Sequence, residues 1–289
     1  MTEGKPVLGV LGGSGLYRVS GLETLERWQI ETPFGPPSGP VVLGRWRGQM
    51  VAFLARHGEG HTIHPGRVNY RANIYALKAV GVERVIAVSA CGSLKESIEP
   101  GDIVVPDQIF DATQGRARSF FEEGVVAHLS APDPFCPVLS RLLAESAEAA
   151  GGRVHRGGTY LTIAGPRFST RAESQVYRGW GMSIIGMTTS PEAFLAREAE
   201  LCYAVLAHVT DYDVWHVSQE PVTVEMVVQR LRQNADHAET VLAHLLTSLP
   251  AARDCACGNA LRDALLTRPE AISAEARRRL GLVVERYLH

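Results

Sequence analysis

Val7-Leu8-Gly9-Val10-Leu11-Gly12-Gly13-Ser14-Gly15 is the stretch that decides the fold, because a short apolar run is followed at once by closely spaced glycines. The apolar run predicts a buried strand, and the glycines predict a tight turn out of it. Such a turn can also close backbone N–H groups on an anion, with Ser14 adding a hydroxyl. The spacing matches neither a P-loop nor a GxGxxG loop, so a plain strand-to-helix turn is an equal alternative.

Further short apolar runs predict more buried strands, and amphipathic segments lie between them. The predicted strands cover Met50–Leu54, Arg84–Val88, Asp102–Val105 and Tyr203–Ala207. The predicted helices cover Tyr70–Val80, Pro137–Ala150, Thr223–Leu246 and Ala274–Tyr287. This alternation of strands and helices predicts an α/β fold.

Two breaks in composition bear on domain organisation. Thr32–Pro40 is short and rich in proline and glycine, which predicts an ordered turn or hairpin loop rather than a linker. Ser248–Arg262 marks a weaker boundary. We therefore predict one α/β domain over residues 1–250, and a C-terminal helical extension over residues 251–289 that packs on the same domain or on a neighbouring subunit.

The composition is ordinary for a globular enzyme with a small ligand. Of 289 residues, 45% are hydrophobic and 21% charged, enough to bury a large core. The chain has 29 Lys and Arg residues and 31 Asp and Glu residues, and the basic residues form no run. Nothing in this charge pattern indicates a nucleic-acid or membrane partner. The N-terminus lacks a basic region and a cleavage site, and no segment of about 18 apolar residues follows. These features predict a cytoplasmic protein.

Five cysteines are scattered along the chain without CxxC spacing: Cys91, Cys136, Cys202, Cys255 and Cys257. This odd set predicts neither a zinc site nor a secreted disulfide framework, and most of the five are expected to be buried thiols. The close pair Cys255-Ala256-Cys257 is the exception. Plain loop thiols are the favoured interpretation there, with a strained disulfide or a soft-metal site as alternatives.

Two further polar clusters follow predicted strands, where the ligands of open α/β sheets bind. Leu54-Ala55-Arg56-His57-Gly58 supplies a cation and an imidazole, and Val88-Ser89-Ala90-Cys91-Gly92-Ser93 supplies a hydroxyl and loop amides. An Arg-His pair alone is more often structural. Three anion-compatible loops on one sheet edge nevertheless predict a phosphate site.

A purine-nucleoside site is indicated by Leu161–Ser174 together with Thr210–Asp213. The first segment places Phe168 within a polar turn, and the second holds two carboxylates, Asp211 and Asp213, which face the same side if the preceding strand continues. An aspartic acid that carries a proton donates to a purine ring nitrogen, and an aspartate accepts from an exocyclic amine. Core packing of Phe168 and a solvated acidic turn are the structural alternatives.

These motifs resemble those of the trimeric purine nucleoside phosphorylase superfamily and, within it, the S-methyl-5'-thioadenosine phosphorylases. The matching strings run in the same order from about residue 6 to about residue 247: Gly-Gly-Ser-Gly, Ala-Arg-His-Gly, Val-Asn-Tyr-Arg-Ala-Asn, Ala-Cys-Gly-Ser, Pro-Gly-Asp-Ile-Val, Gly-Pro-Arg-Phe-Ser, Met-Thr-Thr-Ser-Pro-Glu and Thr-Asp-Tyr-Asp. The resemblance implies the nucleoside phosphorylase fold, an α/β single domain whose central mixed, partly barrel-like β-sheet is flanked by helices.

The resemblance implies a phosphate site made by six residues: Ser14, Arg56, His57, Ser89, Ala90 (through its backbone) and Thr188. Family members usually have threonine at the position of Ser14 and often at that of Ser89, and serine keeps the hydroxyl at both. Inorganic phosphate is then a co-substrate, and no metal or organic cofactor is implied.

The nucleoside site implied by the resemblance holds Phe168, Ser169, Met187, Asp211, Asp213, Val224, Val227, Val228 and His128. Asp211 would protonate or hydrogen-bond purine N7 while the glycosidic bond breaks, and Asp213 would help to hold the amino group. Burial and the Asp213 charge would favour this role by raising the pKa of Asp211. Family members commonly have asparagine where this chain has Gly186, and Gly-Met also occurs among oxopurine relatives.

The resemblance also implies which residues contact the 5' end of the nucleoside and which oligomer the chain forms. The family places apolar residues of one helix, here Val224, Val227 and Val228, against the 5'-methylthio group, although core packing explains the same periodicity. His128 aligns with a histidine that family members contribute across a subunit interface. The resemblance therefore implies a homotrimer or a dimer of trimers.

The predicted reaction is phosphate-dependent cleavage of S-methyl-5'-thioadenosine to adenine and 5-methylthio-α-D-ribose 1-phosphate. The nearest alternative is a purine nucleoside phosphorylase acting on adenosine, inosine or methylthioinosine. Oxopurine relatives carry asparagine at the position of Asp211, which favours the adenine nucleoside. A hydrolytic nucleosidase and a nucleoside-binding protein without catalysis are more distant alternatives, disfavoured by the phosphate-suited loops and by the presence of Arg56 and Asp211.

Overall fold

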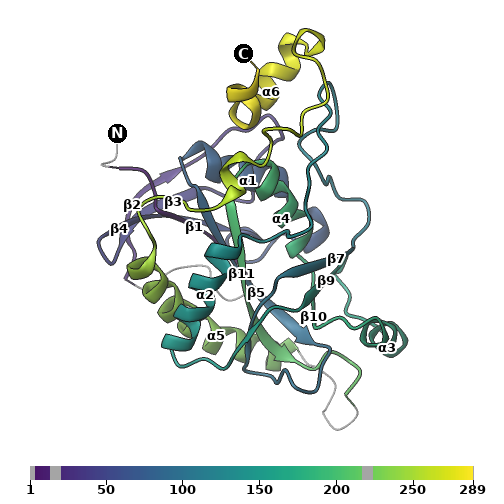
Figure 1. Ribbon diagram of the computed structural model, residues 1–289. Coiled ribbons are helices and arrows are strands. Elements are labelled where there is room, and N and C mark those ends of the chain that lie inside the picture. Colours follow the sequence, from purple (N-terminus) through teal and green to yellow (C-terminus); the bar gives the residue numbers. More distant parts are fainter. Residues whose placement is uncertain (1–3, 14–20, 217–223, 289) are drawn as a thin grey trace.

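The fold is a single α/β domain, as predicted. The structure, a computed structural model, describes residues 4–13, 21–216 and 224–288, and for residues 224–233 it describes the backbone alone. Figure 1 shows a central mixed sheet with helices on both sides. Within the described residues, none of the helices is long and apolar enough to cross a membrane.

The strands form one branched sheet. Their bounds are β1 (Leu8–Gly12), β2 (Glu23–Trp28), β3 (Val41–Trp46), β4 (Gln49–Ala55), β5 (Arg84–Ser93), β6 (Ile103–Val105), β7 (Gln108–Ala112), β8 (Val154–Arg156), β9 (Thr159–Ile163), β10 (Ile184–Gly186) and β11 (Cys202–Asp211). The main path runs β2-β3-β4-β1-β5-β10-β9-β7, and a branch leaves β5 through β11 and β6 to β8. Because β1, β4, β5 and β11 are mutually parallel, their carboxyl ends meet at one edge of the sheet.

The helices are α1 (Tyr70–Ala79), α2 (Pro137–Ala149), α3 (Arg171–Gly179), α4 (Thr189–Glu198), α5 (Val224–Ser248) and α6 (Ala274–Val284), with short 3-10 turns η1 (Pro65–Arg67), η2 (Ala256–Asn259), η3 (Pro269–Ala271) and η4 (Glu285–Tyr287). All four predicted helices are present, and the last one ends as α6 and η4. The five predicted strands correspond to β1, β4, β5, β6 and β11.

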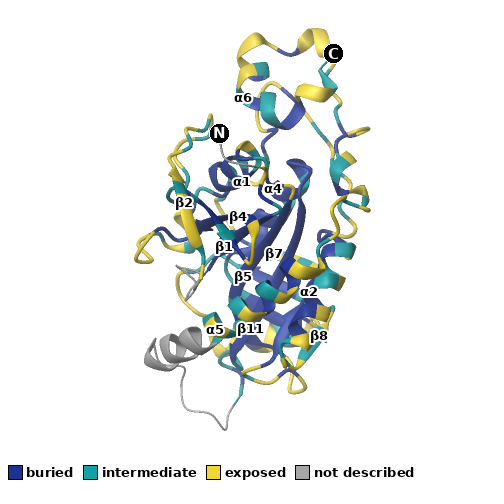
Figure 2. Ribbon diagram, turned by 90° about the vertical axis from the view of Figure 1, so that its left-hand side faces the viewer, coloured by how far each residue is buried: buried dark blue, intermediate teal, exposed yellow. Residues whose placement is uncertain are grey.

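Alternation along the strands gives the sheet two apolar faces. In β11, Tyr203 and Val205 pack in the core that includes residues of α1 and α4, whereas Ala204 and Leu206 pack in the core that includes residues of α2 and α5. Figure 2 shows these buried strands at the centre of the molecule. A strand buried on both faces needs a nearly continuous apolar sequence, which is why β11 was predictable.

The proline-rich segment is the predicted hairpin loop. Residues 29–40 connect β2 to its antiparallel partner β3. The loop is held by two asparagines of the α1 region: Asn69 Nδ2 donates to the Phe34 carbonyl at 2.7 Å, and Asn73 Oδ1 accepts from the Ser38 amide at 2.8 Å. At the other end of the chain, α6 contacts α1 and buries Leu280, so the C-terminal segment packs on the domain.

Candidate active site

A cavity of about 690 Å³ opens at the edge where the parallel strands end. Its lining residues come from the loop after β4, the second half of β5, the segments around β9 and β10, and the end of β11. They are Arg56, His57, His61, Thr62, His64, Pro65, Ser89, Ala90, Cys91, Gly92, Ile163, Pro166, Phe168, Ser169, Ile185, Gly186, Met187, Thr188, Thr210, Asp211 and Asp213. One cavity thus holds residues of both the predicted phosphate site and the predicted nucleoside site.

Arg56 is a buried cation fixed by a buried carboxylate. Its Nε and Nη2 donate to Glu192 at 2.7 and 2.9 Å, and neither side chain is more than 1% exposed. Nη1 donates to the Val88 carbonyl at 3.1 Å. Burial opposes the charge, but the Glu192 carboxylate outweighs it and raises the pKa of Arg56 above its usual value. The guanidinium therefore keeps both its charge and its orientation.

Gly13 explains how the first loop reaches Arg56. A Cβ atom at this position would lie 2.3 Å from the Val88 carbonyl oxygen and 2.8 Å from Arg56 Nη1. Only glycine allows the backbone to approach this closely. The loop that begins after β1 therefore starts in contact with the guanidinium, which fits the predicted anion site.

His57 is neutral and held in one orientation. Burial, together with the charge on Arg56, lowers the pKa of His57 to about 4. Nδ1 lies 2.8 Å from the carbonyl oxygen of Ile63 and must be the donor there, which leaves Nε2 as an acceptor. The ring stacks on His61 with a centroid distance of 4.4 Å. The only formal positive charge that the pair Arg56-His57 supplies near neutral pH is therefore that of Arg56.

The segment Val88–Ser93 belongs to β5, so the predicted loop at this place is wrong. Strand β1 pairs with β5 only as far as Ala87, and β10 joins β5 at Gly92. Between these points, and within the described residues, the β1 side of β5 has no strand partner and borders the cavity at Ser89 and Ala90. A change of strand partner thus creates the open polar edge that the sequence suggested was a loop.

Tyr160 explains the glycine at 186. Its side chain is fully buried, and its hydroxyl lies 2.9 Å from Ser89 Oγ. A Cβ atom on Gly186 would lie 2.0 Å from the Tyr160 hydroxyl oxygen and 2.8 Å from Cζ. The tyrosine fills the space that any larger residue at 186 would need. Gly186 is therefore matched to Tyr160 and Ser89.

Asp211 and Asp213 both line the cavity, but not because the strand continues. β11 ends at Asp211, and Asp213 has a left-handed backbone with φ of 52°. The Asp213 amide donates to Asp211 Oδ1 at 2.7 Å, a turn that short acidic side chains favour, and Thr210 Oγ1 donates to Asp211 Oδ2 at 2.6 Å. The expectation of an extended pair is wrong, yet the turn still brings both carboxylates to the cavity.

Two buried polar atoms at the cavity are poorly satisfied by the protein. Asp213 Oδ2 and Ser169 Oγ make no hydrogen bond of normal geometry in the described part of the chain, although the hydroxyls of Ser174 and Ser169 are near enough to Asp213 to favour its charged form. Burial, with the Asp211 carboxylate adding to it, raises the pKa of Asp213. Buried polar atoms without partners are costly and are expected to be satisfied by a ligand or water.

Of the remaining predicted site residues, some line the cavity, one lies away from it, and others fall outside the described residues. Phe168, Met187 and Thr188 line the cavity, and the Thr188 side chain makes no capping hydrogen bond to α4. Ser14 lies outside the described residues, as do the side chains of Val224, Val227 and Val228. His128 is described and exposed but does not line this cavity.

Several residues of the site were missed from the sequence. His61, Thr62 and His64 follow the Arg-His motif directly, and this polar run next to a strand end was the signal that could have found them. Glu192, in the string Met-Thr-Thr-Ser-Pro-Glu, orients Arg56 and accepts from the Tyr203 hydroxyl at 2.7 Å. Nothing in the local sequence shows that Glu192 and Arg56 meet.

Fold and cavity together define a class of protein: an α/β protein with one cavity, at the carboxyl ends of its strands, that is lined by a buried arginine, an exposed phenylalanine and two aspartates. Comparison with known proteins narrows the class. The family model described as the phosphorylase superfamily matches residues 7–247.

Curated relatives and solved structures agree with this match. S-methyl-5'-thioadenosine phosphorylase of Geobacter sulfurreducens is 50% identical over 283 residues, covering 98% of this chain and 99% of the relative. A methylthioadenosine phosphorylase from an antarctic soil metagenomic library superposes with a TM-score of 0.92 at 45% identity and covers 97% of this chain and 99% of that one. The methylthioadenosine phosphorylase of Schistosoma mansoni in complex with adenine has a TM-score of 0.82 at 37% identity, covering 86% and 93%. The chain belongs to the phosphorylase superfamily and, within it, to the S-methyl-5'-thioadenosine phosphorylase family.

Proposed function

We propose that this enzyme cleaves S-methyl-5'-thioadenosine with inorganic phosphate, giving adenine and 5-methylthio-α-D-ribose 1-phosphate. One observation carries the proposal: a single cavity is lined at once by a buried arginine fixed by a carboxylate and by an aspartate pair. An anion and a purine base can therefore be held together in that cavity. Phosphate is the co-substrate, and the reaction needs no metal or organic cofactor.

Phosphate binding rests on the charge of Arg56 and on neutral donors around it. Glu192 and backbone carbonyls engage four of the five guanidinium N–H groups in the described residues, and the second Nη1 proton is the one proposed to donate to phosphate. Ser89, Thr188 and the Ala90 amide add donors from β5 and the start of α4. His57, neutral with Nε2 as acceptor, suits a protonated phosphate oxygen. A fixed set of donors of this kind orients the nucleophile.

The base is held by the two aspartates and the aromatic residue. In the proposed step, a phosphate oxygen forms a bond to C1' while the bond from C1' to N9 breaks, and the electron pair of that bond passes into the purine. Asp211 donates a proton or a hydrogen bond to N7, which stabilises the leaving adenine. Asp213 accepts from the exocyclic amine through Oδ2, which makes no hydrogen bond of normal geometry within the described residues. Phe168 and Met187 cover the base and the ribose.

The range of nucleosides that the enzyme accepts is the part of the proposal with a plausible alternative. Structures of the Schistosoma mansoni relative are described as adenosine/methylthioadenosine phosphorylase, in complexes with adenine or methylthioadenosine. A purine nucleoside phosphorylase with broader specificity is therefore the alternative for this chain. The proposed 5' contacts, Val224, Val227 and Val228, lie outside the described side chains.

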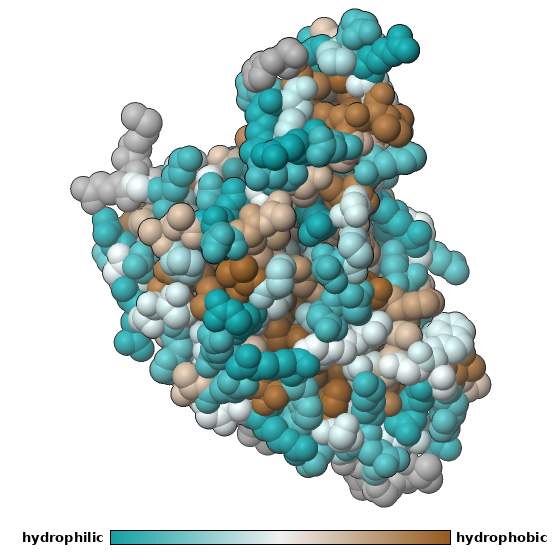
Figure 3. All heavy atoms as spheres, in the orientation of Figure 1, coloured by the Kyte–Doolittle hydropathy of each residue, from teal (hydrophilic) through white to brown (hydrophobic). Residues whose placement is uncertain are grey.

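The same proposal includes a homotrimer or a dimer of trimers. Two large apolar residues, Val126 and Leu266, are 48% and 60% exposed and are joined by a backbone hydrogen bond of 2.9 Å. His128 lies two residues from Val126 and is bonded through its amide to the Ala264 carbonyl. Figure 3 shows hydrophobic residues gathered on the surface of this C-terminal part of the molecule. In the proposed oligomer, a second copy covers this patch and His128 lies toward that copy's cavity. The molecular mass of the protein in solution tests this oligomeric state.

The predicted extension over residues 251–289 contributes Leu266 to this surface. The cytoplasmic location stays a prediction.

A substrate panel tests the proposed function. Release of base is measured from methylthioadenosine, adenosine and methylthioinosine, each with and without phosphate. Phosphate-dependent turnover that is fastest with methylthioadenosine supports the proposal. Turnover without phosphate would instead indicate a nucleosidase, and a preference for methylthioinosine would overturn the assignment of the base.

A further inference from the structure

Four of the five cysteines meet at one place, far from the active site. Cys136, Cys202, Cys255 and Cys257 have all their sulfur atoms within 4.8 Å of one another. Cys202 opens β11 and Asp211 closes it, so a strand of ten residues, about 30 Å long, separates this cluster from the cavity. Cys255 and Cys257 are free thiols, but they belong to a cluster of four cysteines rather than standing alone in a loop.

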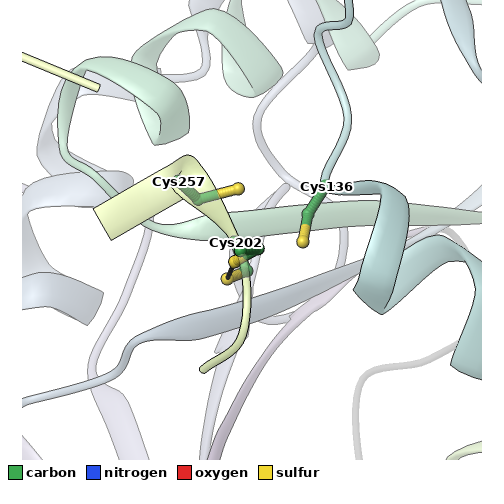
Figure 4. Close-up of side chains that lie close together, drawn as sticks. Cys136, Cys202 and Cys257 are labelled. Carbon is green, nitrogen blue, oxygen red and sulfur yellow. Dashed lines mark hydrogen bonds between the residues drawn. The ribbon is translucent and has the colours of Figure 1, made fainter. Parts of the chain in front are cut away.

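The cysteines come from three separate segments of the chain. Cys136 precedes α2, Cys202 begins β11, and Cys255 and Cys257 lie at η2 in the C-terminal extension. Figure 4 shows the side chains of Cys136, Cys202 and Cys257 close together although they come from different elements. Sequence spacing could not reveal the cluster, because only two of its members are close neighbours in the chain.

The geometry suits a tetrahedral metal ion. A zinc ion bound by four thiolates has Zn–S bonds of about 2.3 Å, which at tetrahedral angles places the sulfur atoms about 3.8 Å apart. The Cys202 and Cys255 sulfurs lie 3.3 Å apart, and all four lie within 4.8 Å, so the observed separations bracket that value. A disulfide would need two sulfurs at about 2.0 Å. Four thiolate sulfurs in this arrangement are a ligand set for zinc or iron.

The surroundings of the cluster also suit a metal thiolate. Three of the four cysteines are buried, and Cys255 is partly exposed. The Leu139 amide, in the first turn of α2, donates to Cys136 Sγ at 3.4 Å, the kind of outer contact that orients a ligand. The cation Arg253 lies against Gly258, beside the pair, because a Cβ atom on Gly258 would be 2.9 Å from Arg253 Nη2. That guanidinium is already paired with the Glu83 carboxylate, which lies 3.2 Å from its Nε, so the metal site does not depend on its charge.

We propose that Cys136, Cys202, Cys255 and Cys257 bind one structural Zn²⁺ ion. Each thiol loses its proton as its sulfur binds the metal, and no oxidant is needed. The ion joins the start of the C-terminal extension to β11 and to the start of α2. It therefore anchors residues 255–257 to the central sheet. This site does not depend on the proposed reaction.

Metal analysis of the full-length protein tests the site. Protein made in zinc-supplied cells and purified with a thiol reductant is expected to hold one zinc ion per chain by plasma mass spectrometry. A mercurial reagent should release that ion in proportion to the thiols it blocks, a readout that needs no variant. Cobalt in place of zinc should give the intense visible bands and sulfur charge-transfer bands of a tetrahedral thiolate site.

Variants separate the cluster from other cysteines. Cys257→Ser and Cys136→Ser are expected to lose the bound zinc, whereas Cys91→Ser, at the one cysteine outside the cluster, should keep one ion per chain. Zinc-free wild-type protein with five free thiols would overturn the proposal. So would iron in place of zinc, or disulfides shown by a mass lower by two hydrogens per bond under the same reducing conditions.

Discussion

Replacing Glu192 with glutamine tests how the site holds its cation. The Glu192 carboxylate accepts from Arg56 Nε at 2.7 Å, from Arg56 Nη2 at 2.9 Å and from the Tyr203 hydroxyl at 2.7 Å, in a place with no exposure. In Glu192→Gln the amide nitrogen must face at least one of these donors, and the arginine charge loses its counter-charge. Removing one partner of a buried ion pair costs about 3–5 kcal/mol. For a chain of this size that lowers the melting temperature by roughly 6–20 °C.

The same change should weaken phosphate binding, because the guanidinium loses its fixed orientation. A loss of about 1.4 kcal/mol in phosphate binding is a tenfold rise in KM for phosphate, and we expect at least that rise, with a smaller effect on KM for the nucleoside. Thermal unfolding and phosphate-dependent kinetics measure the two effects. Glu145→Gln is the control, since it removes only an exposed pair with Arg141 worth well below ~1 kcal/mol. If Glu192→Gln melts like the wild type and keeps its KM for phosphate, Glu192 does not position Arg56.

Three further predictions follow from single residues. Asp211→Asn should lower kcat for methylthioadenosine by roughly 10²–10⁴, the usual contribution of a general acid, and unchanged turnover would remove Asp211 from that role. Phe168→Ala should raise KM for the nucleoside about tenfold, because the stacking of the ring on the base is lost. Trp180→Ala is the control, since both rings are 56% exposed, and it should leave this KM unchanged. Equal effects of the two changes would argue against a contact between Phe168 and the base. Burial raises the pKa of Glu198 to about 7 from 4.5, so its contribution to stability is complete below about pH 4.5 and is lost as the pH rises through 7. Between pH 4.5 and 8, the free energy of unfolding of Glu198→Gln should fall less than that of the wild type, because a neutral amide can still bond Ser119 and Phe120. Parallel curves of unfolding free energy against pH would contradict the shifted pKa.

The part of the fold that could be predicted from the sequence is the part buried on both faces. β11 and β5 are nearly continuous apolar runs, so their pattern alone identifies them. β2 is mostly exposed and β8 and β10 have three residues each, so their patterns carry little signal. β8 and β10 depend on pairing with β6 and β5, which are distant in the chain, and local sequence does not encode such pairing.

The site shows the same division between local and distant information. Motifs next to strand ends pointed to Arg56, Ser89 and Asp211, because the ends of parallel strands meet at one edge. The buried partner Glu192 and the match between Tyr160 and Gly186 depend on contacts between segments far apart in the chain. The four-cysteine cluster is the strongest example, since three segments supply it.

The central claim is that phosphate is the nucleophile, and the sugar product tests it most directly. The enzyme is incubated with methylthioadenosine in limiting phosphate, and the consumed phosphate, the adenine and the sugar are quantified together. The account predicts one 5-methylthioribose 1-phosphate formed and one phosphate consumed for each adenine released. Free 5-methylthioribose with phosphate unconsumed would contradict it.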